Sequence, residues 1–399
     1  MILLRYMLTL LILSGICGLL SGCWDLVEIN RTSLVTGLAI EPGKKAKERV
    51  TFEVLNTAEA QTIEAGKGGT PTTLYTFEGN SLAETTGKLN ELVDRVLIAS
   101  HIRVIIIDEH IARDGLNKYI DVLQRSRFLR EDVTILIARH VPASQLLQVL
   151  PPGGMYASYK IQSQVENLFT VSGGIPKSRL VDITQATLSD GIELALGAIS
   201  IQGNSEESQT MDSIKSLKPK AITKISGAAV FQGDKLLGFL PVEETRMLNL
   251  VRNELKATVV TVPLDKKGRF ASLRYQHRHT SLEVSMQDKE PLIKLHISGK
   301  FQITSIDDNL PLDKVEGYLE LERLATDFLS KQVKASIKRV QSDFGQDIFG
   351  FGQHYYRYHN REAKPIMKEW NTLFSQAKVE VTTSAPISRS ELKTRRLVK

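Results

Sequence analysis

The sequence predicts an α+β protein of several domains, with mixed β-sheets covered by helices. Three observations predict this fold class. Strand-like and helix-like segments alternate over residues 33–139, whereas residues 203–219 are polar and show no periodicity. Several long strand-like segments follow, and then one long amphipathic helix over residues 313–343. Alternation followed by grouped strands indicates a first α/β domain and a C-terminal domain built from an antiparallel sheet and a long helix.

The N-terminal α/β domain is expected over residues 24–141. Its strands are rich in β-branched residues, and Pro42-Gly43 marks the turn between the first two. Asn80 or Ser81 is expected to cap the first helix. The expected strands are residues 33–40, 50–57, 74–79, 101–108 and 132–139, and the expected helices lie over 80–96 and 113–126.

A smaller middle domain is expected over residues 142–202, because short helical segments replace the regular alternation there. Its last segment, residues 192–202, reads as a strand that either belongs to this domain or returns to the first sheet. The polar residues 203–219 end at Pro219 and are interpreted as a linker.

The C-terminal domain is expected over residues 220–388. It begins with a hairpin whose strands flank Gly233-Asp234-Lys235, a tight turn. Within the long helix, apolar residues recur at steps of mostly three and four, which is typical of a helix with one buried face. Residues 389–399 form a basic tail. The remaining expected elements are a helix over 242–255 and strands over 258–264, 270–286, 292–305 and 377–383.

Residues 1–22 are expected to be a signal peptide. Arg5 precedes an apolar run from Met7 to Leu20, about fourteen residues, which is shorter than the roughly 20 that a membrane-spanning helix needs. The next residues, Leu20-Ser21-Gly22-Cys23, resemble the lipobox of bacterial lipoproteins. That resemblance implies a diacylglyceryl and N-acyl lipid on Cys23, which becomes the first residue of the mature chain. Two acyl chains anchor a protein stably to a bilayer.

Composition narrows the function. The other cysteine, Cys17, lies in the expected signal peptide, so the mature chain would have no disulfide. Lys and Arg total 51 against 45 acids, but the tail alone contributes five bases and one acid. No basic stripe with interleaved aromatic residues is present, and the sequence therefore predicts no nucleic-acid partner.

Motifs for catalysis are also missing. The segment RVIIIDEH lacks the phosphate-binding loop that a nucleotidase needs, and neither G-x-S-x-G nor H-E-x-x-H occurs. His277 and His279 stand two apart on an expected strand and would point the same way, yet no third metal ligand is identifiable. The cluster from His354 to His359 is interpreted as aromatic packing rather than a ligand site. The sequence therefore predicts a protein that is not an enzyme and has no metal or other cofactor.

Three blocks, in order along the chain, are similar to one family. They are GCWDLVEIN at 22–30, SHIRVIIIDEHIARDGLNKYIDVLQRSRFLRED at 100–132, and DIFGFG at 347–352 with a later Trp370 and a closing strand. These blocks resemble the Ger(x)C spore germination lipoproteins, the C subunits of nutrient germinant receptors. Two departures are Glu41, where Asp is common, and the ISRSE ending, which lacks an expected Gly.

The resemblance implies a receptor subunit that is required for spore germination. Cys23 would hold it on the outer face of the spore inner membrane, beside integral A and B subunits, with which it assembles without catalysing a reaction. Two alternatives remain open: a solute-binding lipoprotein of a transporter, and a tethered hydrolase of cortex peptidoglycan.

Further site residues are predicted near the lipid and in the third block. Trp24 and Asp25 adjoin Cys23, where an indole ring suits the membrane interface. In the third block we expect a tight turn that buries two aromatic rings against the long helix, because glycine allows backbone angles that other residues resist. The residues of this structural motif are Asp347, Phe349, Gly350, Phe351, Gly352 and Trp370.

Overall fold

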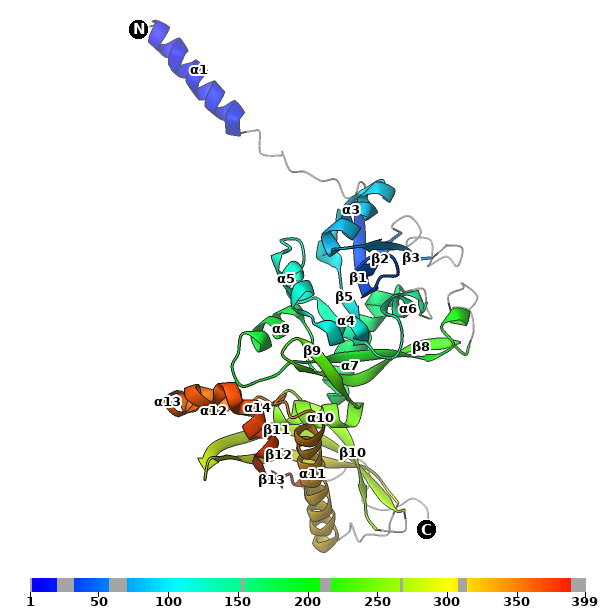
Figure 1. The fold of residues 1–399 in the computed structure, drawn as a ribbon, viewed down its shortest axis with the longest axis vertical. Coiled ribbons are helices and arrows are strands. Elements are labelled where there is room, and N and C mark those ends of the chain that lie inside the picture. Colours follow the sequence, from blue (N-terminus) through cyan, green and yellow to red (C-terminus); the bar gives the residue numbers. More distant parts are fainter. Residues whose placement is uncertain are drawn as a thin grey trace.

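Two β-sheets organise the chain, as Figure 1 shows. The computed structural model describes residues 2–19, 32–56, 70–151, 155–208, 217–265, 268–307 and 314–388. Within these residues, one sheet has nine strands in the order β3-β2-β1-β5-β6-β7-β8-β9, with β4 beside β1, and the other has five in the order β10-β11-β12-β13, with β14 beside β12. The predicted α+β class with mixed sheets is confirmed.

Most predicted strands and helices form close to their expected positions. The strands of the first sheet are β1 (Thr32–Pro42), β2 (Glu48–Leu55), β3 (Thr72–Gly79), β4 (Val96–Ile98), β5 (Val104–Asp108), β6 (Thr134–Ala138), β7 (Ala195–Gly203), β8 (Ala221–Gln232) and β9 (Lys235–Leu240). Those of the second sheet are β10 (Ala257–Pro263), β11 (Phe270–Gln287), β12 (Glu290–Ile306), β13 (Lys378–Ser384) and β14 (Ile387–Ser388).

The first sheet is buried on both faces. Its central strands β1, β5, β6 and β7 run parallel. The side chains of β5 point alternately to the two faces of the sheet, and all of them are buried; Ile105 lies in the core of one face and Ile106 in the core of the other. Because both faces are covered by helices, the sequence of such a parallel strand is a continuous apolar run. One face is covered by α3 (Leu82–Leu92), α4 (Glu109–Asp114), α5 (Asn117–Arg125) and α8 (Leu180–Thr187), the other by α6 (Ala143–Gln148) and α7 (Ala157–Ser172).

Local sequence explains where two of these helices begin and end. Ser81 is the N-cap of α3, and its hydroxyl accepts a hydrogen bond from the backbone N–H of Glu84, as predicted. The single helix expected over residues 113–126 is instead divided into α4 and α5. Gly115 separates them with φ of 132°, a backbone angle that glycine adopts readily.

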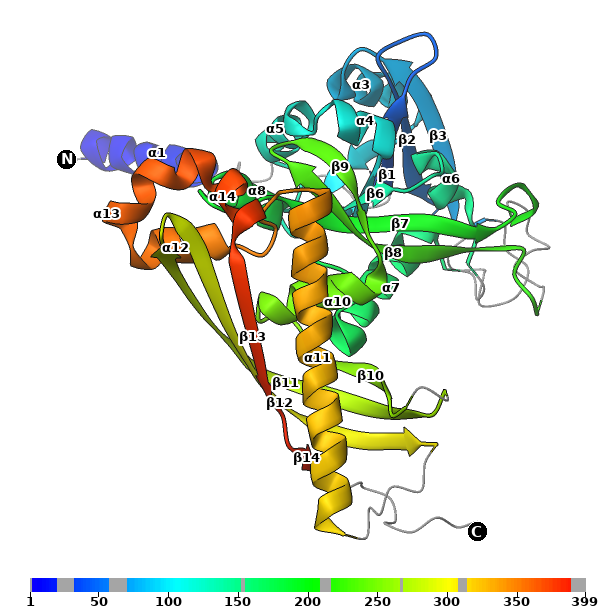
Figure 2. The same ribbon diagram turned by 60° about the horizontal axis from the view of Figure 1, so that its bottom comes forward.

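The second sheet packs against α11 (Val315–Asp343), which lies along it in Figure 2. The buried face of α11 presents residues about one helical turn apart, so that its core stripe runs the length of the sheet. This stripe consists of Leu321, Ala325, Leu329, Val333, Ile337 and Val340. Val315 and Leu319 also fit the apolar spacing of the sequence, but they are 70% and 58% exposed because they lie on another side of the first turns.

The sequence predicted an antiparallel C-terminal sheet, but the sheet in the structure is mixed. β10, β11 and β12 pair antiparallel, but β13 and β14 pair parallel to β12. The reason is the route of the chain: α11 and the short helices after it carry the backbone from one end of the sheet to the other. The last strand therefore enters in the same direction as β12.

The sheet topology also differs from the predicted division into domains. The expected middle region, residues 142–202, contributes α6 and α7 to one face of the first sheet, and β7 pairs parallel to β6. The ends of the expected linker join β7 to β8, which pair antiparallel from Ala195↔Val230 to Gly203↔Ala221. β8 and β9 thus belong to the first sheet, although they follow residue 220. Short amphipathic helices need no separate core when a sheet offers a second apolar face.

The two sheets share a hydrophobic core at their junction. Ala228, Val230 and Leu240 of the first sheet lie in the same buried cluster as Leu273 of β11 and Val333 of α11. The helix α10 (Val242–Val251) connects them, since it packs against both β8 and α11. The junction is therefore packed like a protein interior.

Glu53 of β2 offers a test of the first sheet. Its buried carboxylate accepts hydrogen bonds from the backbone N–H groups of Ala157 (3.0 Å) and Ser158 (3.3 Å), at the start of α7, and from the Thr36 hydroxyl (2.9 Å). Burial raises the pKa of this carboxyl. Replacement of Glu53 by Ala would leave these donors buried without an acceptor, and we expect it to lower the free energy of unfolding by about 3 kcal/mol in urea denaturation. Glu91→Ala, at an exposed position of α3, is the matched control, and an equal effect of both changes would contradict this assignment.

Candidate functional site

The structure brings the predicted motif residues together around one buried carboxylate. Asp347 Oδ1 accepts hydrogen bonds from the backbone N–H groups of Phe349 (3.0 Å) and Gly350 (2.9 Å). Asp347 Oδ2 accepts from the backbone N–H of Gly352 (2.8 Å) and from Trp370 Nε1–H (2.8 Å). Burial raises the pKa of Asp347, whereas the donated hydrogen bonds lower it. The carboxylate holds the turn between α11 and α12 (Phe351–Tyr358) in shape.

Both glycines of the motif are needed for this geometry. Gly350 has φ of 84°, in the left-handed region that glycine favours. A Cβ atom on Gly352 would lie 2.3 Å from Trp370 Nε1, so only glycine lets the indole reach Asp347. The rings of Phe349 and Phe351 stack at 5.2 Å and are buried beside Phe374, in the cluster that includes α11. The predicted tight turn with two buried rings is therefore present.

The same turn fastens the second sheet to the first. The backbone N–H of Glu193 donates to the carbonyl of Asp347 (2.8 Å). Asn371 Oδ1 accepts from the backbone N–H of Asp347 (3.1 Å), while Asn371 Nδ2 donates to Glu193 Oε1 (2.8 Å). Sequence reasoning missed Glu193 and Asn371, although the position of Asn371 directly after Trp370 is a usable signal. We call this set of contacts the Asp347 junction.

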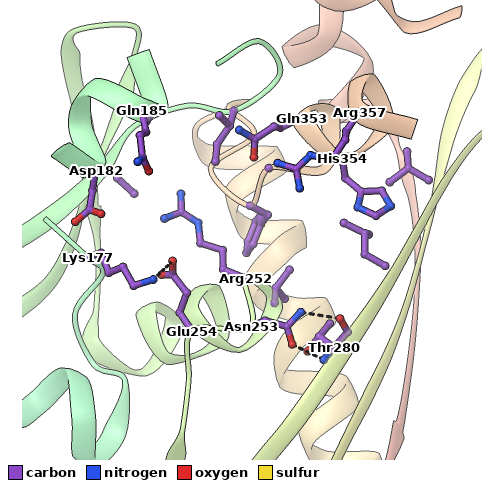
Figure 3. A pocket seen from close by; sticks show the side chains of 18 of the residues that line it. Lys177, Asp182, Gln185, Arg252, Asn253, Glu254, Thr280, Gln353, His354 and Arg357 are labelled. Carbon is purple, nitrogen blue, oxygen red and sulfur yellow. Dashed lines mark hydrogen bonds and ion pairs between the residues drawn. The ribbon is translucent and has the colours of Figure 1, made fainter. Parts of the chain in front are cut away.

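A groove of about 920 Å³ lies beside the Asp347 junction, between the two sheets. Figure 3 shows labelled side chains from α8, α12, β11 and the loop after α10 around it, with α8 on one side and α12 and β11 on the other. Polar and charged residues dominate this lining. The labelled members are Lys177, Asp182, Gln185, Arg252, Asn253, Glu254, Thr280, Gln353, His354 and Arg357.

Several charges in the groove are paired. Lys177 Nζ lies 3.0 Å from Glu254 Oε1, and Arg179 Nη2 lies 2.8 Å from Asp182 Oδ1. Arg252 is different, because it donates from Nε and from Nη2 to the carbonyl of Ile348 and has no carboxylate within ion-pair distance in the described residues. Burial lowers the pKa of Arg252. The groove therefore contains one arginine, Arg252, that forms no ion pair within the described residues, although the charges of Glu254, Asp347 and Asp182 act to raise its pKa.

The two histidines that resembled a metal site do not share a face. A β-bulge falls between them, because His277 pairs with Gly299 and His279 pairs with Ser298, its direct neighbour. His277 Nε2 lies 3.1 Å from Asn253 Oδ1, whereas the side chain of His279 is exposed. Within the described residues, no group of three His, Cys, Asp or Glu side chains lies close enough to hold a metal ion.

His277 gives a pH-dependent prediction. Burial, with a smaller effect of His279, lowers the pKa of His277 from 6.5 to about 4. The neutral ring is thus favoured in the folded state, and its contribution to stability is complete above pH 6.5 and is lost as the pH falls toward 4. We expect the free energy of unfolding to fall more steeply from pH 7 to pH 4 in the wild type than in His277→Gln, although solvent around this half-buried ring reduces the difference. Parallel slopes in urea denaturation would contradict this, and His279→Gln is the control.

The predicted lipidation and membrane-proximal residues Cys23, Trp24 and Asp25 lie outside the described residues. The N-terminal helix α1 (Ile2–Leu19) precedes them, within the expected signal peptide. In the part of the chain that the structure describes, no helix combines the length and apolar character needed to cross a membrane.

Comparison with known proteins assigns the family. Residues 25–201 match the profile of the spore germination protein N-terminal domain, and residues 226–391 match that of spore germination B3/GerAC-like proteins, C-terminal. The chain belongs to the spore germination protein family. Its family members share a role in spore germination. The boundary between the two profiles falls near the β7–β8 connection.

Relatives within this family match along nearly the whole chain. Spore germination protein KC of Bacillus subtilis (strain 168) is 22% identical over 94% of this chain and 93% of its own length. Spore germination protein GerQC of Bacillus cereus is 22% identical over 93% of this chain and 95% of its own length. The crystal structure of the GerBC protein has the same fold, with a TM-score of 0.51 and 17% identity over 91% of this chain and 99% of that one.

Proposed function

We propose that this family member is a lipid-anchored, non-catalytic subunit of a nutrient germinant receptor. Cys23 carries the lipid and holds the folded chain on the outer face of the spore inner membrane, where it assembles with the integral A and B subunits. The single observation that carries the proposal is the match of both family profiles, over residues 25–201 and 226–391, in a chain that also has a lipobox.

The fold supports an assembly role. The Asp347 junction and the shared core fix the two sheets against each other, so that the chain presents surfaces in a constant arrangement. The sheets also differ, since one is covered by helices on both faces and the other packs on α11. A solute-binding lipoprotein would normally have two similar lobes around a cleft. Tethering adds to assembly because it raises the concentration of the chain near membrane partners without new contacts.

Deletion and complementation of the gene test the proposal. Spores that lack the chain are expected to lose germination in response to the nutrient of this receptor, and the wild-type gene is expected to restore it. Calorimetry of the purified chain with amino acids and sugars is the companion measurement. Normal germination of the deletion spores with every nutrient tested would contradict a receptor role, and strong solute binding by the chain alone would favour a solute-binding lipoprotein instead.

A further inference from the structure

The strand β11 is longer than its neighbour on one side. β12 pairs with it as far as Gln287, whereas β10 pairs only from Phe270 to Gln276. Beyond the end of β10, the side chain of Asn253 lies beside Thr280 on the same side of β11. Its Oδ1 accepts a hydrogen bond from the backbone N–H of Thr280 (2.6 Å), and its Nδ2 donates to the carbonyl of Thr280 (2.7 Å). The side-chain amide thus imitates one residue of an adjacent strand.

Beyond Thr280 this edge of β11 has no partner in the described chain. The N–H and C=O groups of Thr280 point away from β12, and in an antiparallel ladder the same direction recurs at every second residue. Leu282, Val284 and Met286 therefore direct their backbone groups outward as well. Pro291 stands opposite Met286 and agrees with this register, because it has no N–H to donate to β11. We call Leu282, Val284 and Met286 the free edge.

Two of the three free-edge residues lie at the groove beside the Asp347 junction. Leu282 and Val284 line that groove, together with Ser281 and Glu283, which are exposed. A bare strand edge is a template for pairing with another chain, and proteins usually protect it with proline, charge or a covering element. Other strands of this protein also have outer edges, such as β10. The edge of β11 differs because Leu282 and Val284 line a polar groove of about 920 Å³.

The charges of the groove indicate the chemistry of its occupant. Within the described residues, Arg357 is exposed on α12 and forms no ion pair, and Arg252 donates hydrogen bonds to the carbonyl of Ile348 and forms no ion pair. Among the lining acids, Asp182 and Glu254 are paired with cations, and the third, Glu283, stands opposite Lys294 of β12 in the ladder. An incoming carboxylate would meet Arg357 and Arg252. The C-terminal tail of this chain, RSELKTRRLVK, is basic and has the wrong charge for this position.

We propose that the free edge of β11 binds an extended, acidic peptide segment of a partner protein by strand addition. Leu282, Val284 and Met286 offer three N–H and three C=O groups over about 14 Å at ~3.4 Å per residue, and backbone hydrogen bonds of this kind supply affinity in strand addition. Arg357 and Arg252 select segments that carry a carboxylate. The identity of the partner, an A or B membrane subunit, rests on the proposed function.

Peptide binding tests this proposal directly. The probes are overlapping peptides that cover the extramembrane segments of the proposed A and B partners, and the receptor is the full-length lipidated chain in nanodiscs. We expect at least one acidic segment to bind. N-methylation of alternate residues of that peptide should weaken binding at least about tenfold in one register and little in the other, since only one set of N–H groups faces β11.

Two pairs of variants make the test specific. Leu282→Pro removes an outward N–H without removing a hydrogen bond to β12, and should abolish binding. Val259→Pro, on the outer edge of β10, is the matched control. Arg357→Glu should weaken binding about tenfold, and a Lys in place of the peptide's carboxylate should restore it. Arg361→Glu, an exposed position on α13 (Asn360–Ala363), is the control for charge.

The outcomes separate the groove from the proposed function. Absence of binding by every peptide, or binding that persists in Leu282→Pro and with either register of N-methylation, overturns strand addition. If the A and B subunits co-purify with the chain in that case, the groove proposal alone fails. If neither co-purification nor peptide binding is found, both fail.

Discussion

Replacement of Asp347 by Ala is expected to lower the free energy of unfolding by about 5 kcal/mol. The change leaves the N–H groups of Phe349, Gly350 and Gly352 and the indole N–H of Trp370 buried without their acceptor. An unsatisfied buried donor costs ~1–3 kcal/mol, and relaxation of the turn recovers part of the sum. Urea denaturation of the purified chain, followed by circular dichroism, measures the loss.

Two further variants keep this prediction testable if Asp347→Ala does not fold. Trp370→Phe retains an aromatic ring but removes one charge-assisted hydrogen bond, and should lower the free energy of unfolding by ~2 kcal/mol. Asp343→Ala is the matched control, because Asp343 is an exposed acid near the end of α11 whose ion pair is solvated. An Asp347→Ala protein as stable as the Asp343→Ala protein would show that the buried carboxylate does not hold the turn.

Replacement of Cys23 by Ala is expected to abolish the lipid anchor and nutrient germination together. Two acyl chains contribute ~0.8 kcal/mol per buried methylene group, and the Cys23→Ala chain has no thiol at this position to carry them. Without the anchor, the chain loses its high effective concentration beside the membrane subunits. Mass spectrometry of the N-terminal peptide, membrane fractionation and a germination assay on the same spores measure the three consequences.

Cys17→Ala is the control for this experiment. Cys17 lies within the expected signal peptide, so its loss should leave the lipid on Cys23, membrane retention and germination unchanged. A Cys23→Ala chain that stays in the membrane fraction and supports germination at the wild-type rate would contradict the anchoring role.

The motif around Asp347 was predictable because its signals are local. A short acid, two glycines and two aromatic residues within six positions specify a turn, and the hydrogen bonds of Asp347 reach Phe349, Gly350 and Gly352. Glu193, which fastens this turn to the first sheet, stands far away in sequence. No local pattern marks it, because its role depends on how the sheets meet.

Register was the feature that sequence patterns could not provide. The alternation of β11 predicted a strand, but the bulge between His277 and His279 reverses which face the second histidine occupies. The pairing of β7 with β8 likewise depends on long-range contacts, and the sequence pattern gave no sign that Gly203 pairs with Ala221. The role of Asn253 was also not predictable from the sequence, since its side chain imitates a strand residue only because it lies beside Thr280.

The fold and the groove together suggest how the chain acts in a receptor. The Asp347 junction holds the two sheets together and so keeps the free edge of β11 in a fixed orientation relative to the first sheet. Under the proposed function, the chain would contribute the geometry in which membrane partners meet rather than a catalytic step.

Quantitative mass spectrometry of the complex purified from spore membranes tests the account most directly. The wild-type chain, tagged at its C-terminus and isolated after mild crosslinking, is compared with the Cys23→Ala chain. The account predicts that both the A and the B subunit are enriched with the wild-type chain and lost with the variant. Recovery of neither subunit with a lipidated, membrane-bound wild-type chain would contradict it.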